Sequence, residues 1–265
     1  MTLSEPLKFI AKVPAITALF WLIKVLSTTV GETFADYLNT LFADVFGFGE
    51  VTAFSVVTAI SVLTLAALLV AQLSAPAYRR WLYWPAIVFV SIVGTLVTDG
   101  LHDLLGVELW VTTVAFGVML GAVLLLWFLS EKTLAMKSIV SPRQEVFYWT
   151  AVLATFALGT SAGDQLAESV GLGYGISLAI FVSSVVLIAV AWRIRIVGPV
   201  LSFWFAYVLT RPLGASLGDL LSQDTSAGGL GLGTGMTSVA FLAAIVLSIT
   251  YLSVKKTDVL EGGGH

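Results

Sequence analysis

The sequence contains no cysteine, and only 11% of its residues are charged. The absence of cysteine excludes disulfide bonds, thiolate metal sites and cysteine nucleophiles. Soluble domains carry about 25% charged residues. A chain with 58% hydrophobic residues and a mean hydropathy of +0.99 therefore belongs to the membrane-protein class. No run of basic residues points to nucleic acid, and we expect no such partner.

Long apolar stretches, in contrast, are abundant. A membrane-spanning helix needs about 20 mostly apolar residues. Stretches of this length that contain no charged residue are 51–78, 109–130, 169–192 and 225–254. Further apolar stretches that do meet a charged residue begin near Val13, Trp81, Val146 and Ile196. We predict an all-α polytopic membrane protein with eight transmembrane helices, in which charged and uncharged helices alternate.

The basic residues predict the orientation of these helices. Those outside the predicted helices all fall on one side of the membrane: Lys8, Lys12, Arg79, Arg80, Lys132, Lys137, Arg143, Arg193, Arg195, Lys255 and Lys256. Cytoplasmic segments are enriched in Lys and Arg, so we expect both termini in the cytoplasm. Residues 255–265 are interpreted as a cytoplasmic tail that ends in a tag remnant, which we exclude from the fold.

The charged helices share one internal repeat. The pattern W-x9-G-x4-D-x-L occurs four times without a gap. Its members are Trp21, Gly31 and Asp36; Trp84, Gly94 and Asp99; Trp149, Gly159 and Asp164; and Trp204, Gly214 and Asp219. Glycines at 47 and 49, 106, 171 and 173, and 231 and 233 mark the turn before each uncharged helix. Repetition at this spacing indicates tandem structural units.

Each unit contains two helices, so all four copies have the same orientation in the membrane and form parallel repeats. We place the repeats at about 13–78, 79–130, 143–192 and 196–254, within a single transmembrane domain that spans residues 1–254.

At this point the chain resembles a family of bacterial membrane proteins of uncharacterised function. That family is built from four tandem repeats, each with two transmembrane segments and a characteristic tryptophan. The resemblance covers residues 13–254 and rests on the tryptophans and on the segments TTVGETFADYL, VGTLVTDGLHDLLG, LGTSAGDQLAE and RPLGASLGDLL. It implies the helical repeat architecture and a location in the bacterial cytoplasmic (inner) membrane, but it implies little chemistry.

Acidic residues gather on the second halves of the charged helices: Glu32, Asp36, Asp99, Asp103, Asp164, Glu168 and Asp219. The bases inside these helices are Lys24 and Arg211, so five negative charges lack a partner if every group is ionised. Burying one charge at the bilayer centre costs about 2.5–3.5 kcal/mol on insertion scales. We therefore expect bound cations, protons or water to meet the excess.

The spacing and the types of these residues favour a cation site. Acids four residues apart lie on one helix face, and hydroxyl groups such as that of Thr29 accompany them. A break at the repeat glycines would add free carbonyl oxygens. Carboxylate, hydroxyl and carbonyl oxygens are ligands for hard cations. We predict Glu32, Asp36, Asp99, Asp164 and Asp219 as metal ligands for Mn²⁺, Mg²⁺ or Ca²⁺, and no resident cofactor.

Several of these residues have plainer interpretations. The acids could be water-exposed residues at helix ends, above all Asp103 and Glu168. Lys24 and Arg211 could neutralise carboxylates, displace a cation, hold an anionic substrate or form a structural salt bridge. The tryptophans Trp21, Trp84, Trp149 and Trp204 fit packing in the repeat core better than ligand stacking, and the glycines Gly31, Gly94, Gly159 and Gly214 fit close helix contact.

The pattern as a whole favours a membrane transporter for small cations, most of all divalent metal ions, with proton coupling available through the same acids. The position four residues before each aspartate holds Glu32 in one repeat but Thr or Ala in the others, which suits a carrier better than a symmetric pore.

The alternative is a proton-coupled carrier of a small organic solute. An enzyme is not expected. The partners are the lipid bilayer and the cation, and a homo-oligomer is compatible with the sequence.

Overall fold

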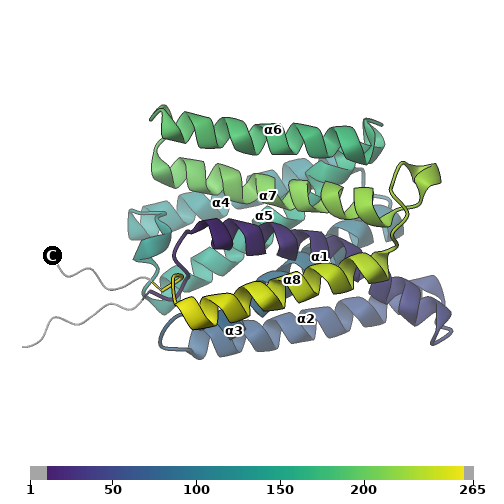
Figure 1. Cartoon of the computed structure of the whole chain (residues 1–265), viewed down its shortest axis with the longest axis horizontal. Coiled ribbons are helices and arrows are strands. Elements are labelled where there is room, and N and C mark those ends of the chain that lie inside the picture. Colours follow the sequence, from purple (N-terminus) through teal and green to yellow (C-terminus); the bar gives the residue numbers. More distant parts are fainter. Residues whose placement is uncertain (1–10, 260–265) are drawn as a thin grey trace, which may run out of the picture.

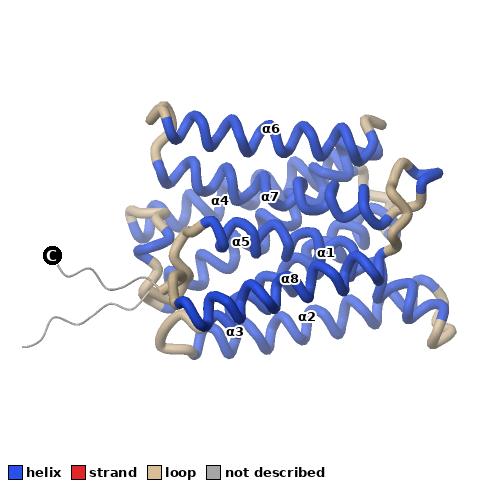
Figure 2. Tube along the Cα trace, viewed as in Figure 1, coloured by secondary structure: helices blue, strands red, loops and turns tan. Residues whose placement is uncertain are grey.

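The computed structural model describes residues 11–259, and within them every regular element is helical. Eight of these helices are long and apolar enough to cross a membrane, which confirms the predicted multi-pass architecture. Figures 1 and 2 show them lying side by side along one common direction. Their bounds are α1 Ala18–Asp44, α2 Glu50–Ser74, α3 Arg80–Asp99, α4 Leu109–Glu131, α5 Pro142–Asp164, α6 Gly173–Arg193, α7 Pro199–Ser222 and α8 Thr234–Lys255.

The helix starts differ most from the expected ones at two places. Helix α1 begins after Thr17, whose hydroxyl caps the helix by accepting a hydrogen bond from the Phe20 amide at 3.2 Å, so Val13 lies outside the helix. Helix α8 begins at Thr234 rather than near residue 225. A short 3₁₀ turn and two glycines with φ of +72° and +79°, Gly231 and Gly233, occupy the intervening residues. Only glycine adopts such angles readily.

The odd-numbered helices form an inner ring and the even-numbered helices surround it. Helix α1 contacts α3, α3 contacts α5, α5 contacts α7, and α7 contacts α1, so the ring closes. Each outer helix packs on the inner helix of the following repeat: α2 on α3, α4 on α5, α6 on α7 and α8 on α1. The inner helices are mostly buried, whereas the outer helices expose their apolar side chains. The four repeats are thus arranged cyclically around one axis.

The repeat glycines lie where neighbouring inner helices touch. Each glycine faces the inner helix of the following repeat: Gly31 meets Ser91, Gly94 meets Phe156, Gly159 meets Arg211 and Pro212, and Gly214 meets Thr28 and Thr29. A side chain at these positions would collide with the neighbouring helix, so the glycines permit the close approach that the ring requires.

The local break that the repeat glycines could have produced is absent from the described helices, because α1, α3, α5 and α7 run through these positions without interruption. The departures from α-helical geometry occur later in two of the repeats. Short π-helical segments, Gly100–Leu104 and Gln165–Ser169, directly follow Asp99 and Asp164. The expected extra carbonyl ligands at the glycines are therefore not provided.

Buried ion pairs tie both described ends of the chain to one end of the bundle. The Lys12 ammonium lies 2.5 Å from one carboxylate oxygen of Glu145, and the other oxygen accepts a hydrogen bond from Gln72 at 3.0 Å. Asp258 accepts hydrogen bonds from Arg80 at 2.6 and 3.0 Å and from the Tyr78 hydroxyl at 2.9 Å. We call this end, which also carries the described basic turns, the terminal end of the bundle.

The predicted tail therefore packs against the bundle at least as far as Asp258, while the proposed tag remnant at 260–265 lies outside the described residues. Burial, together with the neighbouring Asp258 carboxylate, raises the pKa of the Tyr78 phenol. Tyr78 consequently stays protonated and remains a hydrogen-bond donor at any physiological pH.

The close approach of α1 and α3 predicts that enlarging Gly31 destabilises the protein and that shortening Ser91 partly restores its stability. Gly31→Ala should destabilise the protein by about 1–3 kcal/mol, because overpacking a tight contact has this cost and the new methyl group would collide with Ser91. Adding Ser91→Gly should recover part of the loss. Thermal unfolding of the purified protein in detergent measures both effects.

The control is Gly121→Ala in α4, where a methyl group would meet no neighbour within 4 Å. That substitution should leave the melting temperature unchanged or raise it, because alanine has a higher helix propensity than glycine. Equal melting temperatures for the two alanine variants would contradict the proposed helix contact.

Candidate functional site

Each inner helix carries a stripe of residues spaced by four, in which successive members are neighbours on the helix surface. The four stripes start at the residue before the repeat tryptophan and run away from the terminal end. They are Phe20, Lys24, Thr28, Glu32, Asp36 and Thr40; Tyr83, Ile87, Ser91, Thr95, Asp99 and Asp103; Tyr148, Val152, Phe156, Thr160, Asp164 and Glu168; and Phe203, Tyr207, Arg211, Ala215, Asp219 and Gln223. The site is built from these stripes.

Aromatic rings fill the axis near the terminal end. The rings of Phe20 and Phe203 lie 6.2 Å apart, and those of Tyr83 and Tyr148 stack at 6.3 Å. The Tyr83 and Tyr148 hydroxyls are hydrogen-bonded, and Tyr148 lies 3.5 Å from the hydroxyl of Tyr207. All five side chains are buried. We call them the aromatic layer, and they leave no exposed side chain on this section of the axis.

The repeat tryptophans support this layer from its outer side. Trp84, Trp149 and Trp204 are buried, and each makes a ring contact with a member of the aromatic layer. Trp21 also contacts the rings of Phe20 and Phe203, at 5.2 and 5.6 Å, but its side chain is only partly covered. All four tryptophans therefore pack on the aromatic layer, three of them from buried positions.

Lys24 lies next along the axis and has no carboxylate partner among the described residues. Its ammonium lies 3.9 Å from the centre of the Phe156 ring and 4.0 Å from that of Tyr207, a cation–π arrangement. The Lys24 side chain is fully buried, and its nitrogen has no hydrogen-bond acceptor among residues 11–259. Of the roles left open for Lys24, neutralising a carboxylate and forming a structural salt bridge are therefore not what the structure contains.

Arg211 does form the salt bridge that was one of its expected roles. Its Nη2 lies 2.8 Å from Oε2 of Glu32 and also contacts the Thr95 hydroxyl, while its Nη1 donates to the Thr28 carbonyl at 3.2 Å. The Thr95 hydroxyl donates to the same Glu32 oxygen at 3.2 Å. These contacts join α7, α1 and α3. Both members of the ion pair are buried, Arg211 fully and Glu32 to 7% exposure.

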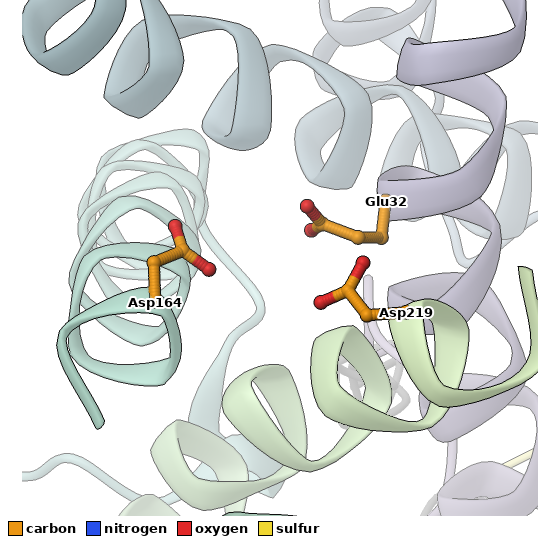
Figure 3. A group of neighbouring side chains, drawn as sticks. All are labelled: Glu32, Asp164 and Asp219. Atoms are coloured by element: carbon orange, nitrogen blue, oxygen red, sulfur yellow. The ribbon is translucent and has the colours of Figure 1, made fainter. Parts of the chain in front are cut away.

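Three carboxylates converge one turn further along the axis. Glu32, Asp164 and Asp219 each offer an oxygen, and the three oxygens lie within 4.8 Å of one another. Figure 3 shows Asp164 pointing from α5 toward the carboxylates of Glu32 on α1 and Asp219 on α7. We call this group the carboxylate triad. Three different repeats contribute to it, and Arg211 supplies one positive charge to it through Glu32.

The other predicted ligands lie around the triad rather than in it. Asp36 and Asp99 are partly exposed and fall outside the group within 4.8 Å, so the structure gathers three of the five predicted metal ligands. Gln223 Nε2 lies 3.5 Å from Asp36. Thr29, also predicted as a ligand, instead donates to the Val25 carbonyl at 3.1 Å and packs beside Gly214.

Exposure rises along the stripes from the aromatic layer toward the end opposite the termini. Glu32 and Asp219 are buried, Asp164 is partly exposed, and Asp103 and Glu168 are exposed. The helix-end interpretation thus describes Asp103 and Glu168, as expected, but not Glu32 or Asp219. His102 is hydrogen-bonded through Nδ1 to the Val107 carbonyl at 2.9 Å and is not part of the triad. The triad is nearer to solvent at this end than at the terminal end.

Sequence reasoning did not identify Glu32 as the partner of Arg211, and it missed the hydroxyl contacts of the aromatic layer and the buried Lys12–Glu145 pair. The repeat alignment contained a signal for the first of these. Arg211 occupies the stripe position one turn before Ala215, so it points at the level where the first repeat carries Glu32. A long guanidinium beside a gap left by alanine could have been matched to that acid.

The buried Arg211–Glu32 pair predicts that removing one partner lowers the stability far more than removing both charges. Arg211→Met should destabilise the protein by about 3–5 kcal/mol, because it leaves a buried carboxylate without its partner. Adding Glu32→Gln should restore most of the loss, since no unpaired charge remains. Thermal unfolding of the two variants tests this expectation.

The matched control is Arg143→Met. Arg143 lies 3.4 Å from Glu131, but its side chain is 70% exposed, and surface pairs contribute at most about 1 kcal/mol. If Arg211→Met is no less stable than Arg143→Met, the pair does not hold the ring together.

Comparison with known proteins identifies the repeat but not the activity. Residues 19–78, 82–133, 147–195 and 202–257 each match one repeat family, described as a Repeat of Unknown Function (DUF347). These stretches agree with the four units read from the sequence. No curated protein and no solved structure matches the chain. Because the matched stretches cover most of its length, the chain belongs to the DUF347 family and carries four tandem copies of the repeat.

Proposed function

We propose that the protein is a membrane transporter for small cations, with divalent metal ions such as Mn²⁺, Mg²⁺ or Ca²⁺ as the favoured substrates. The observation that carries this proposal is the carboxylate triad, in which Glu32, Asp164 and Asp219 converge within the membrane-spanning bundle. If all three are ionised, the single charge of Arg211 leaves two negative charges unmatched. Charges buried at this depth are expensive unless something neutralises them, and a divalent cation does so in one step.

The chemistry of the triad suits a hard cation. All three ligands are carboxylates, and oxygen ligands of this kind are preferred by Ca²⁺, Mg²⁺ and Mn²⁺. No thiol is available anywhere in the chain. The same carboxylates can take up protons when the cation leaves, which makes exchange of cations for protons a natural coupling mode. Arg211 holds Glu32 in place beside the other two carboxylates.

The position of the triad supports a carrier rather than an open pore. Exposed acids lie between the triad and the end opposite the termini, whereas the buried aromatic layer separates the triad from the terminal end. A cation arriving from the first side would stop at the triad until the rings of the aromatic layer part. The basic residues at the terminal end favour a cytoplasmic position for that end, and we infer a location in the bacterial inner membrane.

The alternative, a proton-coupled carrier of a small organic solute, relied on aromatic side chains and on a base that could hold a carboxylate substrate. The base Arg211 is already paired with Glu32, and three of the four repeat tryptophans are buried against other rings. These contacts favour the cation transporter over the organic-solute carrier. Lys24 is the one base in the axis without an acidic partner among the described residues, and it keeps the alternative testable.

Transport assays provide the first test. Proteoliposomes loaded with a metal-sensitive dye should take up Mn²⁺, and Asp164→Asn or Asp219→Asn should each reduce the initial rate at least tenfold, because each variant removes one charged ligand. The matched control is Asp224→Asn, which alters an exposed acid outside the helices and should transport at the wild-type rate. Normal transport by both triad variants would exclude the triad from the path.

Equilibrium binding provides a second and independent test. Millimolar Mn²⁺ should raise the melting temperature of the purified protein, since a ligand at a hundred times its dissociation constant adds about 2.7 kcal/mol of stability. The shift should shrink as the pH falls from 7.5 toward about 4, where carboxylates ordinarily take up protons, because the carboxylates bind the cation only when deprotonated. It should vanish in Asp164→Asn. An equal shift in wild type and Asp164→Asn would assign the binding to another site.

A further inference from the structure

Two equivalent positions between repeats are packed differently: tryptophans fill one of them and leave the other open. Trp127 on α4 makes an edge-to-face contact with Trp204 at 5.7 Å and stacks on Phe147 at 6.3 Å, and it is fully buried. Trp192 on α6 follows Trp149 at the same spacing at which Trp127 follows Trp84. By the cyclic arrangement of the repeats, Trp192 should therefore pack on Trp21 as Trp127 packs on Trp204.

Instead, Trp192 is 54% exposed, and Trp21 is only partly covered. Both tryptophans line a groove of about 540 Å³ between α1, α6 and α7. Most of the other lining residues are apolar, among them Val25, Ile188, Ala206 and Leu213. A volume of this size lies within the range of small-molecule sites, about 300–1,000 Å³. The groove is thus a local departure from the repeat symmetry and not a general gap between helices.

The groove opens on the surface that faces the lipid. Helix α6 exposes a succession of apolar side chains beside the groove, including Val186, Leu187 and Val190. An occupant that reaches the groove through this surface comes from the bilayer, and the apolar lining matches a hydrocarbon chain. The two tryptophans lie toward the terminal end of their helices, where amphipathic rings prefer the membrane interface.

Polar groups occur at the terminal end of the same groove. Ser202 lines it, and its buried hydroxyl has no hydrogen-bond partner among the described residues. A second hollow of about 360 Å³ adjoins the groove, because Ile16, Pro199 and Phe203 line both. This hollow adds the exposed Lys137 to its lining, and neither lining contains an acid. Arg193, which directly follows Trp192, is also exposed.

We propose that this groove is a binding site for an anionic phospholipid. One acyl chain lies between Trp21 and Trp192, the Ser202 hydroxyl donates to the ester carbonyl, and the phosphate lies near Lys137. Basic residues just beyond a membrane-spanning segment attract anionic headgroups. The position of Lys137 therefore favours an anionic lipid over a zwitterionic one. The bound chain occupies the space that a Trp21–Trp192 contact would otherwise fill. The site is separate from the carboxylate triad and does not depend on the proposed transport.

Native mass spectrometry of the delipidated full-length protein tests the proposal. Titration with phosphatidylglycerol should give one tightly retained molecule, held at least tenfold more strongly than phosphatidylcholine with the same acyl chains. Ala206→Trp should abolish this first binding event by filling the groove. Ala115→Trp, on the exposed surface of α4, is the matched control and should bind as the wild type does.

Two milder variants keep the test decisive if Ala206→Trp fails to fold. Lys137→Gln should reduce the preference for phosphatidylglycerol several-fold, and Ser202→Ala should weaken both lipids without changing that preference. Equal retention of the two lipids by the wild type, or a phosphatidylglycerol affinity that none of the three variants changes, would overturn the proposal and leave only non-specific annular lipid.

Discussion

The ion pair between Glu32 and Arg211 joins the first inner helix to the last, at the seam where the ring of repeats closes. Both groups are buried, Arg211 and Glu32 lie 2.8 Å apart, and Thr95 and Thr28 add further hydrogen bonds to the pair. A buried charge whose partner is removed is strongly destabilising, so the pair fixes the relative position of α1 and α7. The same pair holds one oxygen-bearing side chain beside Asp164 and Asp219. The ion pair that joins α1 to α7 and the candidate site therefore share Glu32.

Symmetric and asymmetric positions have different roles in this bundle. The glycine contacts recur at all four seams and make the ring of inner helices regular. At the stripe position of Arg211, by contrast, the other repeats carry Thr28, Ser91 and Phe156. Four equivalent subunits could not place one arginine against one glutamate. A single chain with four diverged repeats can, and the result is one defined group of carboxylates on a pseudo-symmetric scaffold.

The sequence was sufficient to predict the architecture, because the signals for it are local. Apolar length predicted the eight spans, the recurrent W-x9-G-x4-D pattern predicted the units, and the repeat family matches the same stretches. The glycines predicted close packing correctly, but not which helix each one would face. The alternative of a helix break at the glycines was wrong, because a glycine held against a neighbouring helix keeps its helical hydrogen bonds, and the π-helical segments follow Asp99 and Asp164 instead.

The candidate site was predictable only in part. The residue types and their helix faces follow from spacing, so Glu32, Asp164 and Asp219 were among the predicted ligands. The choice of these three over Asp36 and Asp99 depends on the rotation of each helix about its own axis, which packing decides and spacing does not. The distant pairing of Arg211 with Glu32, and the placement of Lys24 over Phe156 and Tyr207, depend on the same three-dimensional arrangement.

The central claim is that the carboxylate triad binds a cation within the membrane. Anomalous diffraction from crystals grown with Mn²⁺ tests it most directly, because the signal locates the metal without reference to any assay of transport. The account predicts a peak bonded to oxygens of Glu32, Asp164 and Asp219, at about 2.0–2.6 Å as is usual for hard cations. A Mn²⁺ peak only at exposed acids such as Asp103 or Glu168, with the triad carboxylates hydrogen-bonded to one another, would contradict it.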